Sequence, residues 1–260
     1  MKADQPVIDS HCHIDLLLEK GGNLKDIYED AEQNKLVAAI QIAASVESFE
    51  YSKKLCHTPG PIDFYYTIGA HPNETHEADT QSGLKFARQN KDDKTFKAIG
   101  EIGLDYFYSK EHSKTQLEVF DSYLELAVEL QKPVCIHTRD AHEDTVQMLK
   151  KVEGQIPVLI HCFTGNREQM DEYLERGAYI SFSGIVTFKN ALELQEAAKF
   201  CPPERMLAET DSPYLAPVPK RGKTNMPGWV RHVATYLETL TENEELPATL
   251  YQNTLDFYRI

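Results

Sequence analysis

Residues 133–161 read PVCIHTRDAHEDTVQMLKKVEGQIPVLIH, in which two short apolar runs, each ending in histidine, enclose a longer segment. Six more apolar runs recur along the chain: VID, LVAAIQIA, DFYYTIGA and FKAIGEIG before these two, and AYISFSG and RMLAET after them. The segments between the runs, such as LKDIYEDAEQN, space apolar residues as amphipathic helices do. Eight strands alternating with helices in 260 residues predict an α/β fold, a (β/α)8 barrel of the TIM type. An open, doubly wound sheet is the alternative.

The chain is expected to form one domain over residues 1–260. No Gly/Ser-rich linker or low-complexity tract divides it, and its 41% of hydrophobic residues are enough for a sizeable core. Residues 226–260 follow the last apolar run and predict two extra C-terminal helices, the second ending near Tyr258.

Charge and cysteine content restrict the classes of function. The net charge of −14 repels a polyanion at long range, which argues against tight binding to duplex DNA. It leaves chemistry on nucleic acid open, because bound divalent ions can be the largest local charges in a site. The five scattered cysteines form no CxxC pair, and the sequence shows neither an apolar leader nor a membrane span. We therefore expect a cytoplasmic protein with reduced thiols, no membrane contact and no obligate protein partner.

Residues that can bind a metal follow the apolar runs. The first run leads to His11 and His13, the third to His71, the fourth to Glu101, the fifth to His137, the sixth to His161 and the eighth to Asp211. In a (β/α)8 barrel the carboxyl ends of all strands meet at one face, where active sites are built. Any one of these residues alone is more simply explained as a hydrogen-bonded core residue. Burying four imidazoles and two carboxylates together without a cation would, however, cost much free energy. The six residues other than His71 therefore predict a metal centre.

Strand alternation adds detail to this prediction. His11 and His13 lie two residues apart, so an extended backbone turns both rings to the same side and Cys12 to the other. The same alternation turns Cys162 away from His161 and predicts no thiolate ligand. Nitrogen and oxygen donors without sulfur suit Zn, Mn, Fe, Co or Mg.

Six motifs, taken together and in order, resemble those of the TatD-type deoxyribonucleases, which belong to the amidohydrolase-like metal-dependent hydrolases. The motifs are HxH (residues 11–13), GAHP (69–72), GEIGLDY (100–106), HTRDA (137–141), HCFTG (161–165) and ETDSPYLAP (209–217). The resemblance covers nearly the whole chain. It implies a distorted (β/α)8 barrel and a nuclease that depends on divalent metal ions.

Carried over to this sequence, the resemblance implies two divalent ions, which would be Mg, Zn or Mn. His11, His13 and Asp211 correspond to ligands of one ion, and His137 and His161 to ligands of the second, with Glu101 bridging both. Many related hydrolases use a carboxylated lysine as the bridge. Glu101 therefore favours the nuclease branch over dihydroorotase or phosphotriesterase types.

The sequence departs from the family pattern at two positions. Asn73 stands where the family often has the last histidine of GxHPH, and Met226 stands where it usually has the glutamate of NEP. Either change could alter activity or substrate preference, but the six expected metal ligands are all present.

The resulting hypothesis is hydrolysis of phosphodiester bonds in DNA, most simply by an exonuclease acting on single-stranded DNA or a DNA end. A hydroxide held between the two ions would attack in line, with Asp211 and Glu101 as catalytic residues. His71 is a third catalytic candidate that would hydrogen-bond to the phosphate, or else a structural residue.

Basic and aromatic residues are candidates for substrate binding. Arg139 lies two residues after His137 and could offer its guanidinium to phosphate, or pair with Asp105 instead. Lys220, Arg221 and Lys223 form a basic loop after the eighth strand that could guide the DNA backbone, or simply be solvated. Aromatic residues expected at the rim could stack on bases or pack locally: Tyr106, Phe107, Tyr108 and Trp229.

Two other functions fit the same pattern. A barrel metallohydrolase could act on an amide, ester or lactone of a small molecule, because the same hydroxide attacks carbonyl carbon. A metal-stabilised scaffold without enzymatic activity would instead have a closed site that is fully coordinated by protein.

Overall fold

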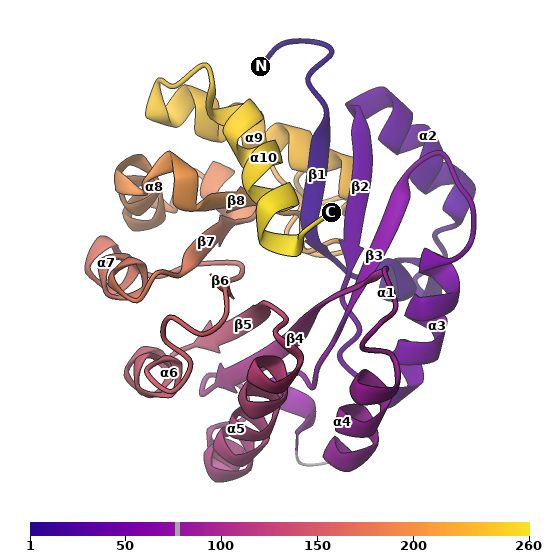
Figure 1. Ribbon diagram of the computed structural model, residues 1–260. Helices are drawn as coiled ribbons and strands as arrows, with labels where there is room; N and C mark the ends of the chain where they lie inside the picture. Colours follow the sequence, from indigo (N-terminus) through magenta and orange to yellow (C-terminus); the bar gives the residue numbers. More distant parts are fainter. Residues whose placement is uncertain (76–78) are drawn as a thin grey trace.

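A computed structural model describes residues 1–75 and 79–260 and contains the predicted barrel (Figure 1). Eight parallel strands follow one another in the order β1 to β8, so each strand pairs with its neighbours in the sequence. The strands are β1 (Val7–Cys12), β2 (Leu36–Gln41), β3 (Asp63–Ile68), β4 (Phe96–Asp105), β5 (Val134–Arg139), β6 (Val158–Ile160), β7 (Tyr179–Phe182) and β8 (Met206–Ala208). Each of the eight apolar runs coincides with or begins one strand, and the strand order confirms the predicted barrel and excludes the doubly wound sheet.

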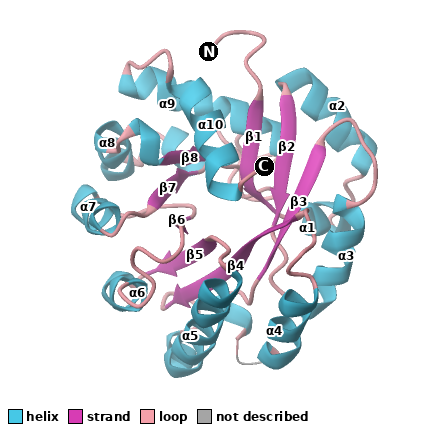
Figure 2. Ribbon diagram, viewed as in Figure 1, coloured by secondary structure: helices cyan, strands magenta, loops and turns pink. Residues whose placement is uncertain are grey.

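Helices surround the strands (Figure 2). They are α1 (Ile14–Glu19), α2 (Leu24–Asn34), α3 (Val46–Cys56), α4 (Thr80–Gln89), α5 (Ser113–Leu130), α6 (His142–Leu149), α7 (Arg167–Glu175), α8 (Leu192–Phe200), α9 (Val230–Thr241) and α10 (Leu246–Tyr258). Short 3-10 helices are η1 (Pro72–Glu74), η2 (Lys110–His112), η3 (Gly184–Thr187), η4 (Pro203–Arg205) and η5 (Pro227–Trp229). The two C-terminal helices α9 and α10 were both expected, and the second ends at Tyr258 as predicted.

Local sequence signals set the bounds of the helices. The side chain of Asn23 accepts a hydrogen bond from the Asp26 amide and caps the N-terminus of α2. At the other end, Lys35 adopts a left-handed conformation with φ of 58°, which ends the helix before β2 begins. The predicted helix LKDIYEDAEQN coincides with α2 for these reasons.

The seam between β1 and β8 closes the barrel through side chains as well as backbone. The His13 amide donates to the Ser212 carbonyl over 2.8 Å, and the Asp211 amide donates to the His11 carbonyl over 3.0 Å. Ser10 Oγ donates to the Ala208 carbonyl, and the buried Asp9 carboxylate accepts from the Thr210 amide. This seam therefore brings the carboxyl ends of the first and last strands together.

The amino end of the barrel is filled by the last turn of α10, which lies across the middle of the ring of helices (Figure 1). Phe257 and Tyr258 are each 1% exposed and pack against inward-facing strand residues such as Leu159 and Leu207. The Tyr258 hydroxyl donates to the Ser10 carbonyl over 2.9 Å, so its polar group is satisfied. The interior is thus a packed core below the carboxyl end of the strands.

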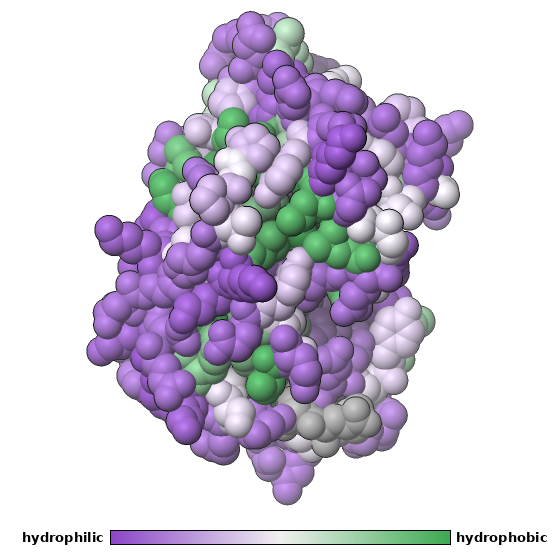
Figure 3. All heavy atoms as spheres, turned by 90° about the vertical axis from the view of Figure 1, so that its right-hand side faces the viewer, coloured by the Kyte–Doolittle hydropathy of each residue, from purple (hydrophilic) through white to green (hydrophobic). Residues whose placement is uncertain are grey.

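The surface over the side of α2 and α3 is mainly hydrophilic, with a hydrophobic strip across its middle (Figure 3). None of the helices in residues 1–75 and 79–260 is long and apolar enough to cross a membrane.

Candidate metal centre

Residues far apart in the sequence meet at the carboxyl end of the barrel. His11 lies in β1, Glu101 in β4 and His137 in β5, whereas the other three residues follow the ends of their strands. All six predicted metal ligands converge there: His11, His13, Glu101, His137, His161 and Asp211. His11, Glu101 and His137 lie inside their strands rather than at the strand tips, which differs from the predicted placement.

The GEIG motif explains how β4 turns Glu101 into the barrel. The register between β4 and β5 shifts between Ile99 and Ile102, as at a β-bulge, which re-aims the intervening side chain. Gly103 has φ of +143°, and a Cβ atom there would lie 2.0 Å from the His137 carbonyl oxygen. Only glycine therefore allows the two strands to approach so closely.

The backbone at Asp211 is in the left-handed region, with φ of 54°. This conformation is uncommon for residues other than glycine but is tolerated by aspartate. Asn225, which is fully buried, holds the segment in place by donating from Nδ2 to the carbonyls of Thr210 and Tyr214. The Asp211 carboxylate is thereby fixed over β1.

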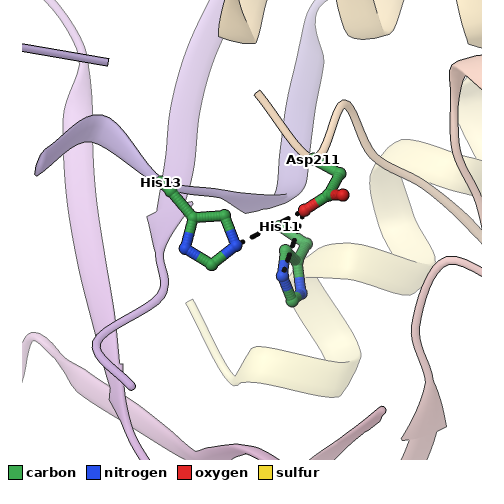
Figure 4. A group of neighbouring side chains, drawn as sticks. All are labelled: His11, His13 and Asp211. Carbon is green, nitrogen blue, oxygen red and sulfur yellow. Dashed lines mark ion pairs between the residues drawn. The ribbon is translucent and has the colours of Figure 1, made fainter. Parts of the chain in front are cut away.

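His11, His13 and Asp211 form the first group of donor atoms (Figure 4). Asp211 Oδ1 lies 3.4 Å from His13 Nε2 and 3.7 Å from His11 Nε2. Glu101 Oε2 completes the group, at 3.4 Å from His11 Nε2 and 3.9 Å from His13 Nε2.

The second group surrounds the other oxygen of the same carboxylate. Glu101 Oε1 lies 2.8 Å from His137 Nδ1 and 2.8 Å from His161 Nε2. His71 Nε2 is 3.5 Å from Oε1, so the structure places His71 beside this group as well. One carboxylate therefore presents one oxygen to each group of donors.

Two buried carboxylates face the outer nitrogens of the histidines in the second group. Asp105 Oδ2 lies 3.1 Å from His137 Nε2, and Glu209 Oε1 lies 3.3 Å from His161 Nδ1. A neutral imidazole that donates its proton to such a carboxylate keeps the lone pair of its other nitrogen for a cation. Asp105 and Glu209 thus favour His137 binding through Nδ1 and His161 binding through Nε2.

His71 has the opposite arrangement. Its Nδ1 accepts a hydrogen bond from the Asn73 amide over 3.2 Å, so in the neutral ring the proton is on Nε2. Burial lowers the pKa of His71 to about 4, which keeps the ring neutral near pH 7. His71 therefore presents an N–H donor to the centre rather than a lone pair.

Electrostatics within the cluster are strongly coupled. Burial alone would raise the pKa of Glu101, but the surrounding histidines outweigh it and hold that pKa well below the usual value. Burial alone would lower the pKa of His161, but Glu101 and Glu209 raise it well above the usual value. Without a metal ion, a proton on His161 therefore offsets part of the negative charge of these carboxylates.

The donor set fits divalent metal ions. His11 Nε2 is buried and has no hydrogen-bond partner among the described residues, although it points between two carboxylates. Such an atom is costly unless something occupies the space that it faces. Because the two groups contain only nitrogen and oxygen donors, they suit Zn or Mn, and the carboxylates also suit Mg.

The sequence analysis did not identify Glu209 and Asp9, two buried acids that contact His161 and His11. Glu209 is fully buried, and its Oε2 has no hydrogen-bond partner among the described residues. The sequence spacing could have indicated Glu209, because it precedes Asp211 by two residues, as His11 precedes His13. Asp9 stands two residues before His11 and accepts from the His11 amide.

The cysteines only partly follow the alternation argument. Cys12 is buried and donates to the Ile40 carbonyl, away from the donor groups. Cys162 instead lines the pocket above the metal centre, because β6 ends at Ile160 and φ of Cys162 is 43°. Its thiol lies 3.2 Å from Ser183 Oγ and belongs to neither group of donors.

One of the predicted substrate-binding residues lines the pocket above the metal centre, and the three residues of the basic loop do not. Arg139 lines the pocket above the metal centre and is exposed. The basic loop lies outside the residues that line this pocket, among those that the structure describes. Lys220 Nζ is 5.1 Å from the centre of the Trp229 ring, the Arg221 guanidinium is 3.7 Å from that of Phe188, and Lys223 is exposed.

Both departures from the family pattern have a structural role. The Asn73 side chain bridges the loops, because Nδ2 donates to Asp105 and Oδ1 accepts from Ser109. Met226 is partly buried and packs against the hydrophobic core.

An eight-stranded barrel with this cluster at its carboxyl end defines a metal-dependent hydrolase. A sequence profile described as "TatD related DNase" matches residues 8–259. The chain belongs to the TatD family.

Relatives of known sequence agree with this assignment. The chain is 39% identical over 240 residues to the uncharacterized metal-dependent hydrolase YcfH of Escherichia coli (strain K12), covering 90% of this chain and 88% of that protein. It is 35% identical to the uncharacterized metal-dependent hydrolase YabD of Bacillus subtilis (strain 168), covering 98% of this chain and 99% of that protein. The crystal structure of YJJV, a TatD homologue of Escherichia coli K12, superposes with a TM-score of 0.90 at 25% identity and full coverage of both chains.

Proposed function

We propose that this chain hydrolyses phosphodiester bonds in DNA with the help of two divalent metal ions. The observation that carries the proposal is the geometry of Glu101, whose two oxygens face two separate groups of donors. His11, His13 and Asp211 would hold one ion, and His137 and His161 the other. A pair of ions suits phosphodiester hydrolysis, because a negatively charged phosphate and the leaving oxygen both need positive charge beside them.

When bound, the ions would supply hydroxide at neutral pH and neutralise the phosphate. The chain itself supplies orientation and proton transfer. Asp211 Oδ1 faces the first group and would accept the proton of the attacking water. His71 Nε2–H would donate to a phosphate oxygen, since its Nδ1 is already occupied by the Asn73 amide.

The space above the centre supports a flexible, polymeric substrate. The pocket measures about 800 Å³ and is lined by residues of both donor groups together with Arg139, Tyr108 and Tyr214. Single-stranded DNA or a DNA end would bring fewer charges to this acidic chain than a long duplex, and exonucleolytic cleavage suits such an end. A cytoplasmic location is part of the proposal and agrees with five cysteines that are all free thiols.

The test is incubation of metal-reconstituted protein with end-labelled single-stranded DNA, double-stranded DNA and RNA, followed by separation of the products by length. We expect single-stranded DNA to be shortened stepwise and a chelator to stop the reaction. A His137→Ala/His161→Ala variant should fold, lose one bound ion and lose cleavage. Full turnover by that variant would contradict the assignment of the second group.

A hydrolase of a small amide, ester or lactone is the second candidate. It is favoured by the apolar residues Ile185 and Leu215, which also line the pocket. Hydrolysis of such substrates by protein that leaves all three nucleic acids intact would replace the proposed function with this one.

A further inference from the structure

Two large aromatic side chains are exposed beside the metal pocket. Phe107 is 55% exposed and Tyr108 is 63% exposed, and both follow β4 in the loop that leads to α5. Together with Arg139 at the end of β5 they form a surface that we call the aromatic platform. Neither the metal centre nor the barrel core uses these rings.

The aromatic platform is built to be rigid. The Arg139 guanidinium lies 4.0 Å from the ring centre of Phe107 and 4.7 Å from that of Tyr108. The two rings are 4.7 Å apart and perpendicular. The backbone amides of Phe107 and Tyr108 donate to Asp105 Oδ1 over 3.0 Å and 2.9 Å, so a buried carboxylate anchors the loop. Exposed rings held this firmly lose little conformational entropy when a ligand binds.

The aromatic platform also stands at the junction of two cavities. Tyr108 and Arg139 line the pocket of about 800 Å³ above the metal centre. Arg139 also lines a second cavity of about 750 Å³, beside the N-termini of α5 and α6, and Thr138 and Thr164 line both. A chain-like ligand that leaves the metal centre in this direction must pass Arg139.

We propose that the aromatic platform is a nucleobase-stacking subsite, an inference that rests on the proposed function. The base next to the scissile phosphate stacks on Tyr108, whose ring Phe107 supports edge to face, and the edge of the Arg139 guanidinium donates to the adjoining phosphate. Every base offers a flat π-face, so such a subsite binds single strands without reading their sequence. Bases inside a duplex are stacked on both faces by their neighbours, so the subsite favours single-stranded or frayed ends.

Charge and position favour a nucleotide over a protein partner on these rings. The guanidinium is a cation in a chain of net charge −14, and it lies two residues from His137 in the metal centre. Its central carbon lies over both rings, and the N–H groups at its edge can donate to phosphate. A protein partner would need a broad surface, whereas Tyr108 and Arg139 line a concave pocket and Arg139 also lines a second cavity.

The test compares ligands with and without bases. The probes are a phosphorothioate oligodeoxythymidylate, which resists hydrolysis, and a sugar–phosphate oligomer of the same length and linkages that lacks bases. Binding to metal-loaded wild-type protein and to a Phe107→Ala/Tyr108→Ala variant is measured by fluorescence anisotropy. We expect the variant to bind the oligodeoxythymidylate about tenfold more weakly and the base-free oligomer with unchanged affinity.

The chain offers a matched control. Phe200 on α8 is 49% exposed, and the Arg167 guanidinium lies 3.7 Å from its ring centre, but neither residue lines the two cavities. Phe200→Ala should leave both affinities unchanged. A Tyr108→Phe variant, which keeps the π-face, should bind the oligodeoxythymidylate as wild type does.

Two results would overturn the inference: equal binding of the oligodeoxythymidylate by wild type and the double variant, or an equal loss for both oligomers. Cleavage of unmodified oligonucleotide by the wild type is measured in parallel. Base-dependent binding that needs the aromatic platform, without any cleavage, would reject the proposed function and keep the subsite.

Discussion

The two ends of the barrel are built from opposite kinds of side chain. At the carboxyl end, His11, Glu101 and His161 are buried beside one another, although each prefers water. At the amino end, Phe257 and Tyr258 of α10 fill the interior with apolar surface and one satisfied hydroxyl. The amino end therefore contributes apolar burial to the free energy of folding, whereas the carboxyl end uses part of that free energy to hold charged groups together. Substitutions at the carboxyl end should therefore lower activity and metal binding, and substitutions at the amino end should lower stability.

Replacing the shared carboxylate should give the largest effect. Glu101→Gln removes the anionic oxygens that face both donor groups, so we expect at least about a thousandfold loss of hydrolysis. The rise in melting temperature that added Mn²⁺ or Zn²⁺ produces should shrink too, because a ligand stabilises a protein only as far as it binds. Activity assays, elemental analysis and thermal melts in matched buffers measure these effects. A fully active Glu101→Gln variant would remove the basis for a shared carboxylate.

A substitution at the amino end should lower stability and leave the reaction unchanged. Phe257→Ala leaves a cavity in the closed end, so the free energy of unfolding should fall by about 3–5 kcal/mol. The fraction that remains folded should keep its turnover rate, because Phe257 belongs to the packed cluster below the metal centre. Denaturant unfolding gives the stability, and Phe200→Ala on the surface is the control, with a change of about 0.5 kcal/mol or less. A loss of turnover per folded molecule would show that the two ends are coupled.

The third prediction concerns Glu209, which lies between the two ends beneath His161. Glu209→Gln weakens the carboxylate partner of His161 Nδ1, so metal affinity should fall about 10- to 100-fold. Loading with Co²⁺ reports on the geometry as well, because the absorption spectrum of the ion depends on how its ligands are oriented. The exposed Glu193→Gln on α8 is the control, with no change in either measurement. An unaltered spectrum and affinity would limit Glu209 to packing.

Much of the fold was predictable because its signals are local. The eight apolar runs and the helices between them follow from side-chain periodicity, and Asn23 shows how a cap fixes one boundary. The convergence of the six candidate donors was predictable because parallel strands in a barrel end on one face. This rule did not predict that Glu101 lies within β4. There a β-bulge, rather than the end of the strand, directs its side chain inward.

Partners set by tertiary contacts were harder to predict. Asp105 was a candidate partner for Arg139, yet in the structure it contacts His137 and two backbone amides, and Arg139 stacks on rings instead. The side-chain periodicity that identifies strands says nothing about which acid a given base will meet. Loops such as the one carrying Lys220 are likewise placed by packing against neighbours, here Trp229, rather than by their own composition.

Asp105 has a consequence for how this scaffold can vary. It holds the rim through the amides of positions 107 and 108, and every residue except proline has an amide to offer. Substitutions can therefore replace the rings at these two positions while Asp105 keeps its contact with the His137 imidazole. We therefore expect a library of variants at positions 107 and 108 to change substrate preference while keeping the catalytic residues in place.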